Sequence, residues 1–420
     1  MAGPHTAFLR AFNVGFGDCF LLSFVYAADK KRHVLIDFGS TRPPPGAASN
    51  HLVKIAEKIR DLTNGKLDVV IATHRHKDHI SGFATAANKK GSGDIIASLK
   101  PEVVVQPWTE DPATPENATG PKAMKSALKA MSALSAKVWS YARKLDADRM
   151  RRLGITEGER AFLSFAGENN ISNKSAVLNL MKMGKLKAKY IQADEMLDLK
   201  AILPGITIDV LGPPTVDQHA AVAHQSPNNP DEYWFSVAKQ GAGSSAKIKP
   251  LFAKFAAPLP PYAGWLAHRM NKMQKDSLMG MVRALDDAMN NTSLILLFKC
   301  GGKSFLFPGD AQWENWQYAL SKPEYVEALK SVDLYKVGHH GSRNATPKTL
   351  WKLFEHKSKT KTTKGRLVTV MSTLHGVHGE SAATAVPSSS LSTELEHDSH
   401  HHTTEVVELD KLYDEIEFTL

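Results

Sequence analysis

Short apolar runs separated by turn residues open the chain. Residues 7–13, 19–26 and 33–38 are apolar and β-prone, and glycine lies in the turn between the first two and directly after the third. This spacing is typical of antiparallel strands joined as a meander. Residues 51–62 then carry apolar side chains along one face at helical spacing, which predicts an amphipathic helix.

Further along, predicted strands alternate with predicted helices. Strands are expected at 67–72, 102–106, 206–211, 293–299, 303–307, 332–337 and 366–371, and helices at 311–329 and 346–354. Two stretches interrupt this order. We interpret about 110–165 as a helical insertion and 215–288, rich in Pro, Ala, Lys and aromatics, as a lid-like insertion. The pattern predicts an α/β domain over residues 1–380 and a partly acidic C-terminal extension over 381–420.

Composition narrows the class of protein. Of the 420 residues, 42% are hydrophobic and 23% charged, as in ordinary globular proteins. The chain has no apolar run of about 18 residues and no secretory signal pattern at its start. Cys19 and Cys300 are too few for a disulfide framework or a four-thiolate zinc site. We therefore expect a cytoplasmic protein without a membrane partner.

The charge balance favours anionic partners. The formal net charge is +9, and residues 123–153 are rich in lysine and arginine. A basic surface attracts phosphates and nucleic acid. The basic stretch is either a solvated helix face or a phosphate-attracting rim. The 215–288 insertion and the C-terminal tail are alternative surfaces for a protein partner.

The histidines cluster directly after one predicted strand. Residues 74–79 read HRHKDH and follow the apolar strand at 67–72. Residues at i and i+2 after a strand end can point the same way, so His74 and His76 can bind the same cation. Asp78 and His79, further round the turn, can face a second one. Imidazoles with a carboxylate suit Zn²⁺, with Mn²⁺ or Fe as alternatives.

Other predicted strands also end in ligand-type residues. Asp310 follows the strand at 303–307, and His339 and His340 follow the strand at 332–337. The sequence leaves open which of these two histidines is the ligand. A metal site built on a sheet requires several strands that end in such residues at the same edge. Three predicted strands of this chain end in this way. Lys336 and Arg343 flank the second turn, either as solvated charges or facing a substrate anion.

At this point the chain resembles the metallo-β-lactamase superfamily, whose signature is His-x-His-x-Asp-His. Within it, the chain looks most like the β-lactamase-like domain of the DNA-uptake protein ComEC and like phosphorylcholine esterase. The narrower resemblance rests on four further motifs: 13–18 (NVGFGD) with Leu21 and Leu22, 35–39 (LIDFG), 290–293 (NNTS) and 336–342 (KVGHHGS).

The resemblance implies an αββα sandwich with a metal site at one edge. Its ligands would be His74, His76, Asp78, His79, Asp310 and one of His339 or His340. Asp18 and Asp37 also match positions of this pattern, and Asp37 is expected either to accept a hydrogen bond from a ligand histidine or to be a turn or capping carboxylate.

The chain also departs from the superfamily pattern in two places. Asn290 or Asn291 stands where many members have a further metal-binding histidine, which implies weaker binding of the first metal. A late Gly-His-Pro is replaced by 385–387 (AVP), for which His375 or His378 could substitute.

These observations predict a metal-dependent hydrolase. One or two cations would lower the pKa of water to about 7 and so supply hydroxide at neutral pH. Asp78 would orient or deprotonate the water beside His79, and Ser342 would stabilise developing oxyanion charge. The leading substrate class is a phosphodiester, including nucleic acid. The alternatives are a small carboxylic ester, lactone or thioester, or a non-catalytic metal-bound scaffold.

Overall fold

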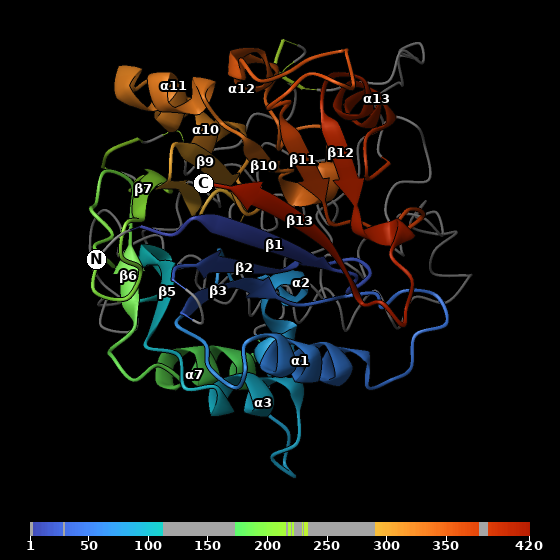
Figure 1. Ribbon diagram of the computed structural model, residues 1–420. Coiled ribbons are helices and arrows are strands. Elements are labelled where there is room, and N and C mark those ends of the chain that lie inside the picture. The colour runs from blue at the N-terminus through green and yellow to red at the C-terminus, as the bar shows by residue number, and fades with distance from the viewer. Residues whose placement is uncertain are drawn as a thin grey trace, which may run out of the picture.

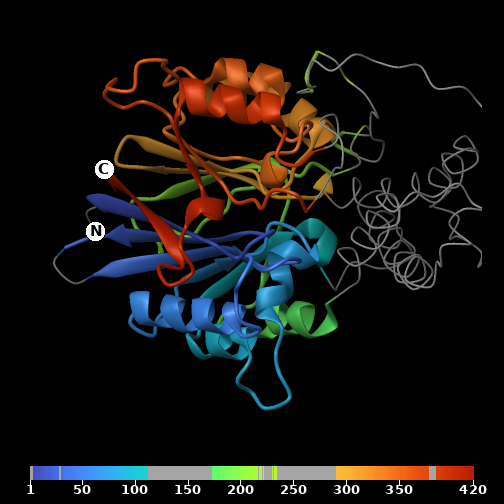
Figure 2. The same ribbon diagram turned by 90° about the vertical axis from the view of Figure 1, so that its right-hand side faces the viewer.

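Two mixed sheets packed face to face form the centre of the computed structural model (Figures 1 and 2). The structure describes residues 3–27, 30–111, 173–215, 290–377 and 385–420, with positions 217–219, 221, 229 and 231–233. Both proposed insertions lie almost wholly outside these residues.

The first sheet has seven strands in the order β13-β1-β2-β3-β4-β5-β6. Their bounds are β1 (Thr6–Phe12), β2 (Cys19–Val25), β3 (Lys31–Phe38), β4 (Val69–Ile71), β5 (Val103–Pro107), β6 (Lys189–Ile191) and β13 (Tyr413–Thr419). Strands β1, β2 and β3 pair antiparallel as the predicted meander, whereas β3, β4, β5 and β6 run parallel. The carboxyl ends of β3 and β4 therefore share one edge of the sheet.

The second sheet has six strands in the order β12-β11-β10-β9-β8-β7. Their bounds are β7 (Thr207–Gly212), β8 (Ile295–Cys300), β9 (Lys303–Phe307), β10 (Leu334–Lys336), β11 (Val368–Met371) and β12 (His400–Thr403). Strands β9, β10, β11 and β12 are parallel. Their carboxyl ends form a second shared edge.

Helices cover the outer face of each sheet (Figure 2). The first sheet carries α1 (His51–Leu62), α3 (Ser92–Ser98) and α7 (Lys174–Lys182). The second carries α10 (Trp313–Leu320), α11 (Pro323–Lys330), α12 (Lys348–Leu353) and α13 (Ser389–Asp398). Short turns of helix lie at α2 (Lys77–Ile80), Ser81–Phe83, Trp108–Glu110, His339–Gly341 and Thr404–Val406.

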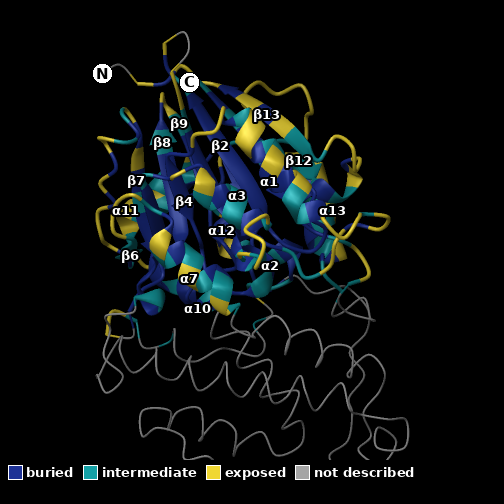
Figure 3. Cartoon of the chain, turned by 90° about the horizontal axis from the view of Figure 1, so that it is seen from below, coloured by how far each residue is buried: buried dark blue, intermediate teal, exposed yellow. Residues whose placement is uncertain are grey.

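Burial follows this layered order. Apolar side chains of both sheets, among them Leu9, Phe24, Leu296 and Phe305, form a common core between the sheets. Two further apolar clusters pack the helices against the outer sheet faces. Figure 3 shows central strands such as β2 and β4 buried, whereas exposed positions lie on helices, loops and the edge strand β13. The architecture is the predicted αββα sandwich.

Two predictions of secondary structure need correction. The single helix expected at 311–329 is two helices, because Pro323 begins α11 and has no N–H to continue α10. Residues 381–420 are not an extension outside the domain. Strand β13 pairs with β1 along its whole length, and β12 pairs with β11, so the tail supplies one edge strand to each sheet. The sandwich therefore continues to the last strand rather than ending near residue 380.

Candidate metal centre

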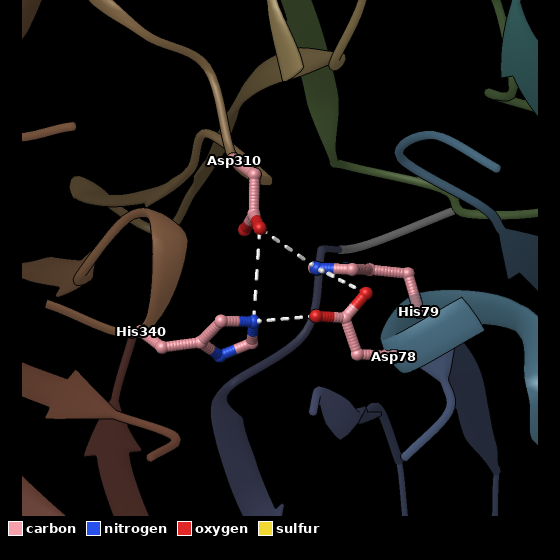
Figure 4. A group of neighbouring side chains, drawn as sticks. All are labelled: Asp78, His79, Asp310 and His340. Atoms are coloured by element: carbon pink, nitrogen blue, oxygen red, sulfur yellow. Dashed lines mark hydrogen bonds and ion pairs between the residues drawn. The ribbon is translucent and has the colours of Figure 1, made fainter. Parts of the chain in front are cut away.

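Four buried side chains from three segments converge at the shared strand edge (Figure 4). Asp78 and His79 lie on α2, just after β4, while Asp310 follows β9 and His340 follows β10. The Nε2 atom of His79 lies 3.1 Å from Oδ2 of Asp310. The Nε2 atom of His340 lies 3.2 Å from Oδ2 of Asp78 and 3.7 Å from Oδ2 of Asp310.

Unusual backbone geometry makes this convergence possible. Gly39, after β3, lets α2 approach closely, because a Cβ atom there would lie 2.5 Å from the backbone of Asp78. His339, His340 and Gly341 have φ values of +42°, +52° and +83°. Successive left-handed residues are costly for non-glycine side chains. The surrounding structure holds this strained turn, in which the two neighbouring histidines take different places.

Hydrogen bonds set the tautomers of the two histidines. Nδ1 of His79 donates to Oδ2 of Asp37 at 2.8 Å, and Asp37 also accepts from the N–H and hydroxyl of Thr73. Nδ1 of His340 donates to the carbonyl oxygen of Ser372 at 3.0 Å. A backbone carbonyl and an ionised carboxylate only accept, so in their neutral forms both imidazoles carry the lone pair on Nε2. This is the usual support for a metal-binding histidine.

The donor set fits a divalent cation. Two Nε2 lone pairs and the Asp310 carboxylate face one another in a buried space, which is unfavourable without a positive charge among them. Within the described part of the chain, Nε2 of His79 makes no hydrogen bond of good geometry, and it faces the carboxylates of Asp310 and Asp78 at 3.1 and 3.9 Å. Burial alone would lower the pKa of His79, but the carboxylates of Asp310 and Asp37 raise it well above its ordinary value. The pocket thus attracts a proton or a metal ion.

Asp78 remains charged in this environment. Burial would raise the pKa of its carboxyl, but the imidazoles of His79 and His340 hold that pKa well below its usual range. Asp310 behaves likewise: burial opposes ionisation, and His79 and His340 lower its pKa. Both carboxylates are therefore ionised at neutral pH and available as ligands.

His74 and His76 form a separate pair beside this group. Nε2 of His74 lies 2.9 Å from Nδ1 of His76, and the His74 ring centroid lies 4.1 Å from that of His79. Burial, with the neighbouring His79 and His76, lowers the pKa of His74, so its imidazole is neutral. Among the described residues, two groups of histidine and carboxylate donors are close enough to hold a metal ion, and neither group includes His74 or His76. The structure thus places the four candidate donors of the histidine motif near one another but in two unequal sets.

The structure distinguishes the two histidines that the sequence left open. His340 is fully buried among the four ligands, whereas the His339 side chain is 21% exposed and its Nε2 lies 4.0 Å from Oδ2 of Asp310. The Ser342 hydroxyl donates to Oδ1 of Asn344 at 2.9 Å and accepts from Nδ1 of His339 at 3.0 Å. Ser342 therefore orients His339, and its oxyanion role stays a prediction.

A second acidic group lies behind His79. Asp18, Asp37 and His79 are close enough to form another donor set. Here, however, Nδ1 of His79 is already bonded to Asp37, and Lys336 forms an ion pair with Asp18. The expectation that Lys336 is a solvated charge was wrong, because its side chain is only 2% exposed. Its position directly before a ligand-bearing turn was the available clue.

Some residues singled out from the sequence lie elsewhere. The His375 side chain is 64% exposed and forms an ion pair with Glu405 at the surface, and His378 lies outside the described residues. Sequence reasoning also missed Thr73 and the carbonyl of Ser372, which hold Asp37 and His340. Both directly follow predicted strands, where such supporting residues could have been sought.

Comparison with known families agrees with this geometry. Residues 13–159 match the family model of the metallo-beta-lactamase superfamily. The match includes the histidine motif, whereas Asp310 and His340 lie beyond it and are joined to the motif by the fold. A search of curated proteins found no match. Among the described residues, no helix is both long and apolar enough to cross a membrane.

Proposed function

We propose that this chain is a metal-dependent hydrolase that cleaves phosphodiesters. The metallo-beta-lactamase superfamily match points to metal-dependent hydrolysis. The observation that carries the proposal is the buried group of Asp78, His79, Asp310 and His340, with the tautomers of both histidines set by hydrogen bonds. Zn²⁺ is the expected cation, because nitrogen and carboxylate ligands in a small buried set suit it.

The chain's own residues have distinct roles in this proposal. His79 and His340 present Nε2 to the cation, while Asp37 and the carbonyl of Ser372 hold their rings in place. Asp78 is ionised and can orient a water molecule or accept its proton. When bound, the cation supplies Lewis acidity that polarises the scissile group and lowers the pKa of water.

Charge supports an anionic substrate. Lys77 lies within the histidine motif and Arg343 follows Ser342 in the second turn, whereas Arg75 is paired with Glu110, with 3.6 Å between Nη1 and Oε2. The formal net charge of the chain is +9. Cations close to the scissile bond favour a phosphodiester over a neutral ester, because they offset the charge of the phosphate.

A substrate panel tests the proposal. Wild type and Asp78→Ala, each with measured zinc content, are assayed on bis(p-nitrophenyl) phosphate, single- and double-stranded DNA, and lactones. We expect wild type to cleave the phosphodiesters and Asp78→Ala to lose at least about 100-fold in kcat/KM, the scale of a lost general base. A nucleic-acid substrate would also show binding that weakens steeply with salt.

Three outcomes would contradict parts of this reading. Lactone cleavage without phosphodiester cleavage would favour the small-ester alternative. Bound zinc with no cleavage of any substrate would favour a metal-bound scaffold. Full activity in a metal-free Asp78→Ala protein would refute metal-dependent hydrolysis itself.

A further inference from the structure

A buried lysine lies within the metal centre. Lys336 is the last residue of β10, and its side chain is 2% exposed. Its Nζ atom pairs with Asp18, lies 3.6 Å from Oδ1 of Asp310 and donates to the carbonyl oxygen of Gly309 at 3.2 Å. Lysine is almost never fully buried unless it is paired. The centre therefore contains a fixed positive charge beside one of its candidate ligands.

The two oxygens of Asp310 face different surroundings. Oδ2 points to Nε2 of His79 and Nε2 of His340, at 3.1 and 3.7 Å. Oδ1 accepts the backbone N–H of His339 at 3.2 Å and lies near the ammonium of Lys336. Because Oδ1 is held on the lysine side, Oδ2 is the oxygen that faces a cation.

One divalent ion leaves the centre close to neutral. Lys336 offsets the charge of Asp18, and Asp37 is a carboxylate that accepts hydrogen bonds from Thr73 and His79. The four carboxylates of Asp18, Asp37, Asp78 and Asp310 and the ammonium of Lys336 give a net charge of −3, which becomes −1 with one divalent ion and +1 with two. A second divalent ion would bring two more positive charges close to a fixed ammonium in a poorly screened interior.

The ligands available to a second ion are fewer. His74 and His76 offer ring nitrogens 2.9 Å apart, but neither belongs to a close set of three or more metal-type donors in the described residues. The sequence position at which many superfamily members have a further metal-binding histidine is held here by Asn290 or Asn291, whose side chains are neutral and buried. Amides are weaker zinc ligands than imidazoles, so this side of the centre is the poorer site.

We propose that Lys336 is a positioning residue that acts as a fixed internal cation. It neutralises Asp18 and holds Oδ1 of Asp310, so that the centre binds one divalent ion tightly, through Asp78, His79, Asp310 and His340. The pair of His74 and His76 holds a second ion only weakly. This inference rests on the proposed metal-dependent function and concerns the number of ions that the centre holds.

Metal stoichiometry tests the role of Lys336 without an activity assay. The test variant is Lys336→Met, which removes the ammonium and keeps the carboxylate of Asp18. The charge-balanced comparison is Asp18→Asn/Lys336→Met, which removes both members of the buried pair and should hold the second ion as weakly as wild type. The matched control is Lys303→Met, which removes the lysine of the pair with Asp333 at the far end of β9, where Nζ and Oδ1 are 2.7 Å apart. Zinc per chain is measured by atomic emission after dialysis, and affinities by competition with a chelator.

We expect one tightly bound zinc per wild-type chain and a second ion held at least about 100-fold more weakly. The test variant should bind the second ion about tenfold or more tightly than wild type, because the repulsion from the ammonium is gone. The control should behave like wild type. The Lys336→Arg variant keeps the charge and should also hold one tight ion.

The outcomes separate this inference from the proposed function. Two tight ions in wild type, or an unchanged second-ion affinity in the test variant, would overturn the role of Lys336 and leave metal-dependent hydrolysis standing. No bound ion in wild type would refute the proposed function as well. If the test variant does not fold, the wild-type stoichiometry still decides, since two equally tight ions contradict the proposal.

Discussion

Two histidine-rich segments of this chain have very different surroundings. Residues 74–79 lie in the turn after β4, where the ring of His79 faces the Asp310 carboxylate from β9. Residues 400–402 form β12, an edge strand of the second sheet. There, His401 bonds the hydroxyl of Thr369 at 2.9 Å and His402 bonds Asp414 at 2.6 Å.

The difference shows that local histidine density does not make a metal site. Along β12, successive side chains point to opposite faces, so the rings of His400 and His402 share one face and that of His401 lies on the other. The turn after β4 instead meets the ends of β3, β9 and β10 at one edge. Neither close donor group in the described residues contains a histidine of β12. Convergence of several strand ends is what gathers the ligands.

The largest test of this contrast removes one histidine from each segment. His79→Ala should lower zinc affinity by about a thousandfold or more, well beyond the 10–100-fold typical of a lost hydrogen-bond partner of a ligand. The reason is that His79 both faces Asp310 and anchors to Asp37. His402→Ala should leave the tight ion in place. Zinc content and chelator competition measure both, and equal losses in the two variants would refute the contrast.

The part of the candidate site that the sequence indicates is its local donors. The histidine motif and the ligands at the ends of β9 and β10 follow from apolar runs that each end in His or Asp. The C-terminal strands were missed because the polar, acidic composition of that region hid them. In β13, however, buried Ile416 and Phe418 alternate with exposed Glu415 and Glu417, which is the period of a half-buried strand.

Other features depend on geometry that no local pattern contains. A left-handed turn decides whether His339 or His340 joins the group of candidate metal donors. The two residues have the same side chain, so the sequence alone does not distinguish them. The burial of Lys336 depends on Asp18, which lies more than 300 residues away in the chain. Such pairings become visible only after both sheets are assembled.

A finer test separates the two adjacent histidines of the second ligand-bearing turn. His340→Ala should lower zinc affinity by about 100-fold, because it deletes a buried ligand whose ring is held by Ser372. His339→Ala should change zinc affinity by less than about tenfold, which is the lower limit of the effect usually seen when a hydrogen-bond partner of a metal ligand is removed. Chelator competition measures each variant, with the folded state checked by circular dichroism. A greater loss in His339→Ala would exchange the two assignments.

The smallest expected effect concerns β12, where a histidine contributes to stability instead of metal binding. Burial, assisted by the nearby His402, lowers the pKa of His401 from 6.5 to about 4. As pH falls from about 6.5 to about 4, the unfolded chain binds a proton at this position while the folded chain does not. The stability that the neutral ring contributes above pH 6.5 is thus lost on acidification, by up to about 3 kcal/mol.

His401→Asn tests this linkage, because the shorter amide can still bond Thr369 but does not titrate. Urea unfolding from pH 7 to pH 4 should show a smaller loss of unfolding free energy in this variant than in wild type. His400→Asn, at the exposed neighbouring position, is the control and should retain most of the wild-type loss. If His401→Asn loses as much stability on acidification as wild type, the ring is protonated in the folded state. The histidines of β12 would then be a solvated cluster. The difference between them and the histidines after β4 would consist only in the carboxylates that face the latter.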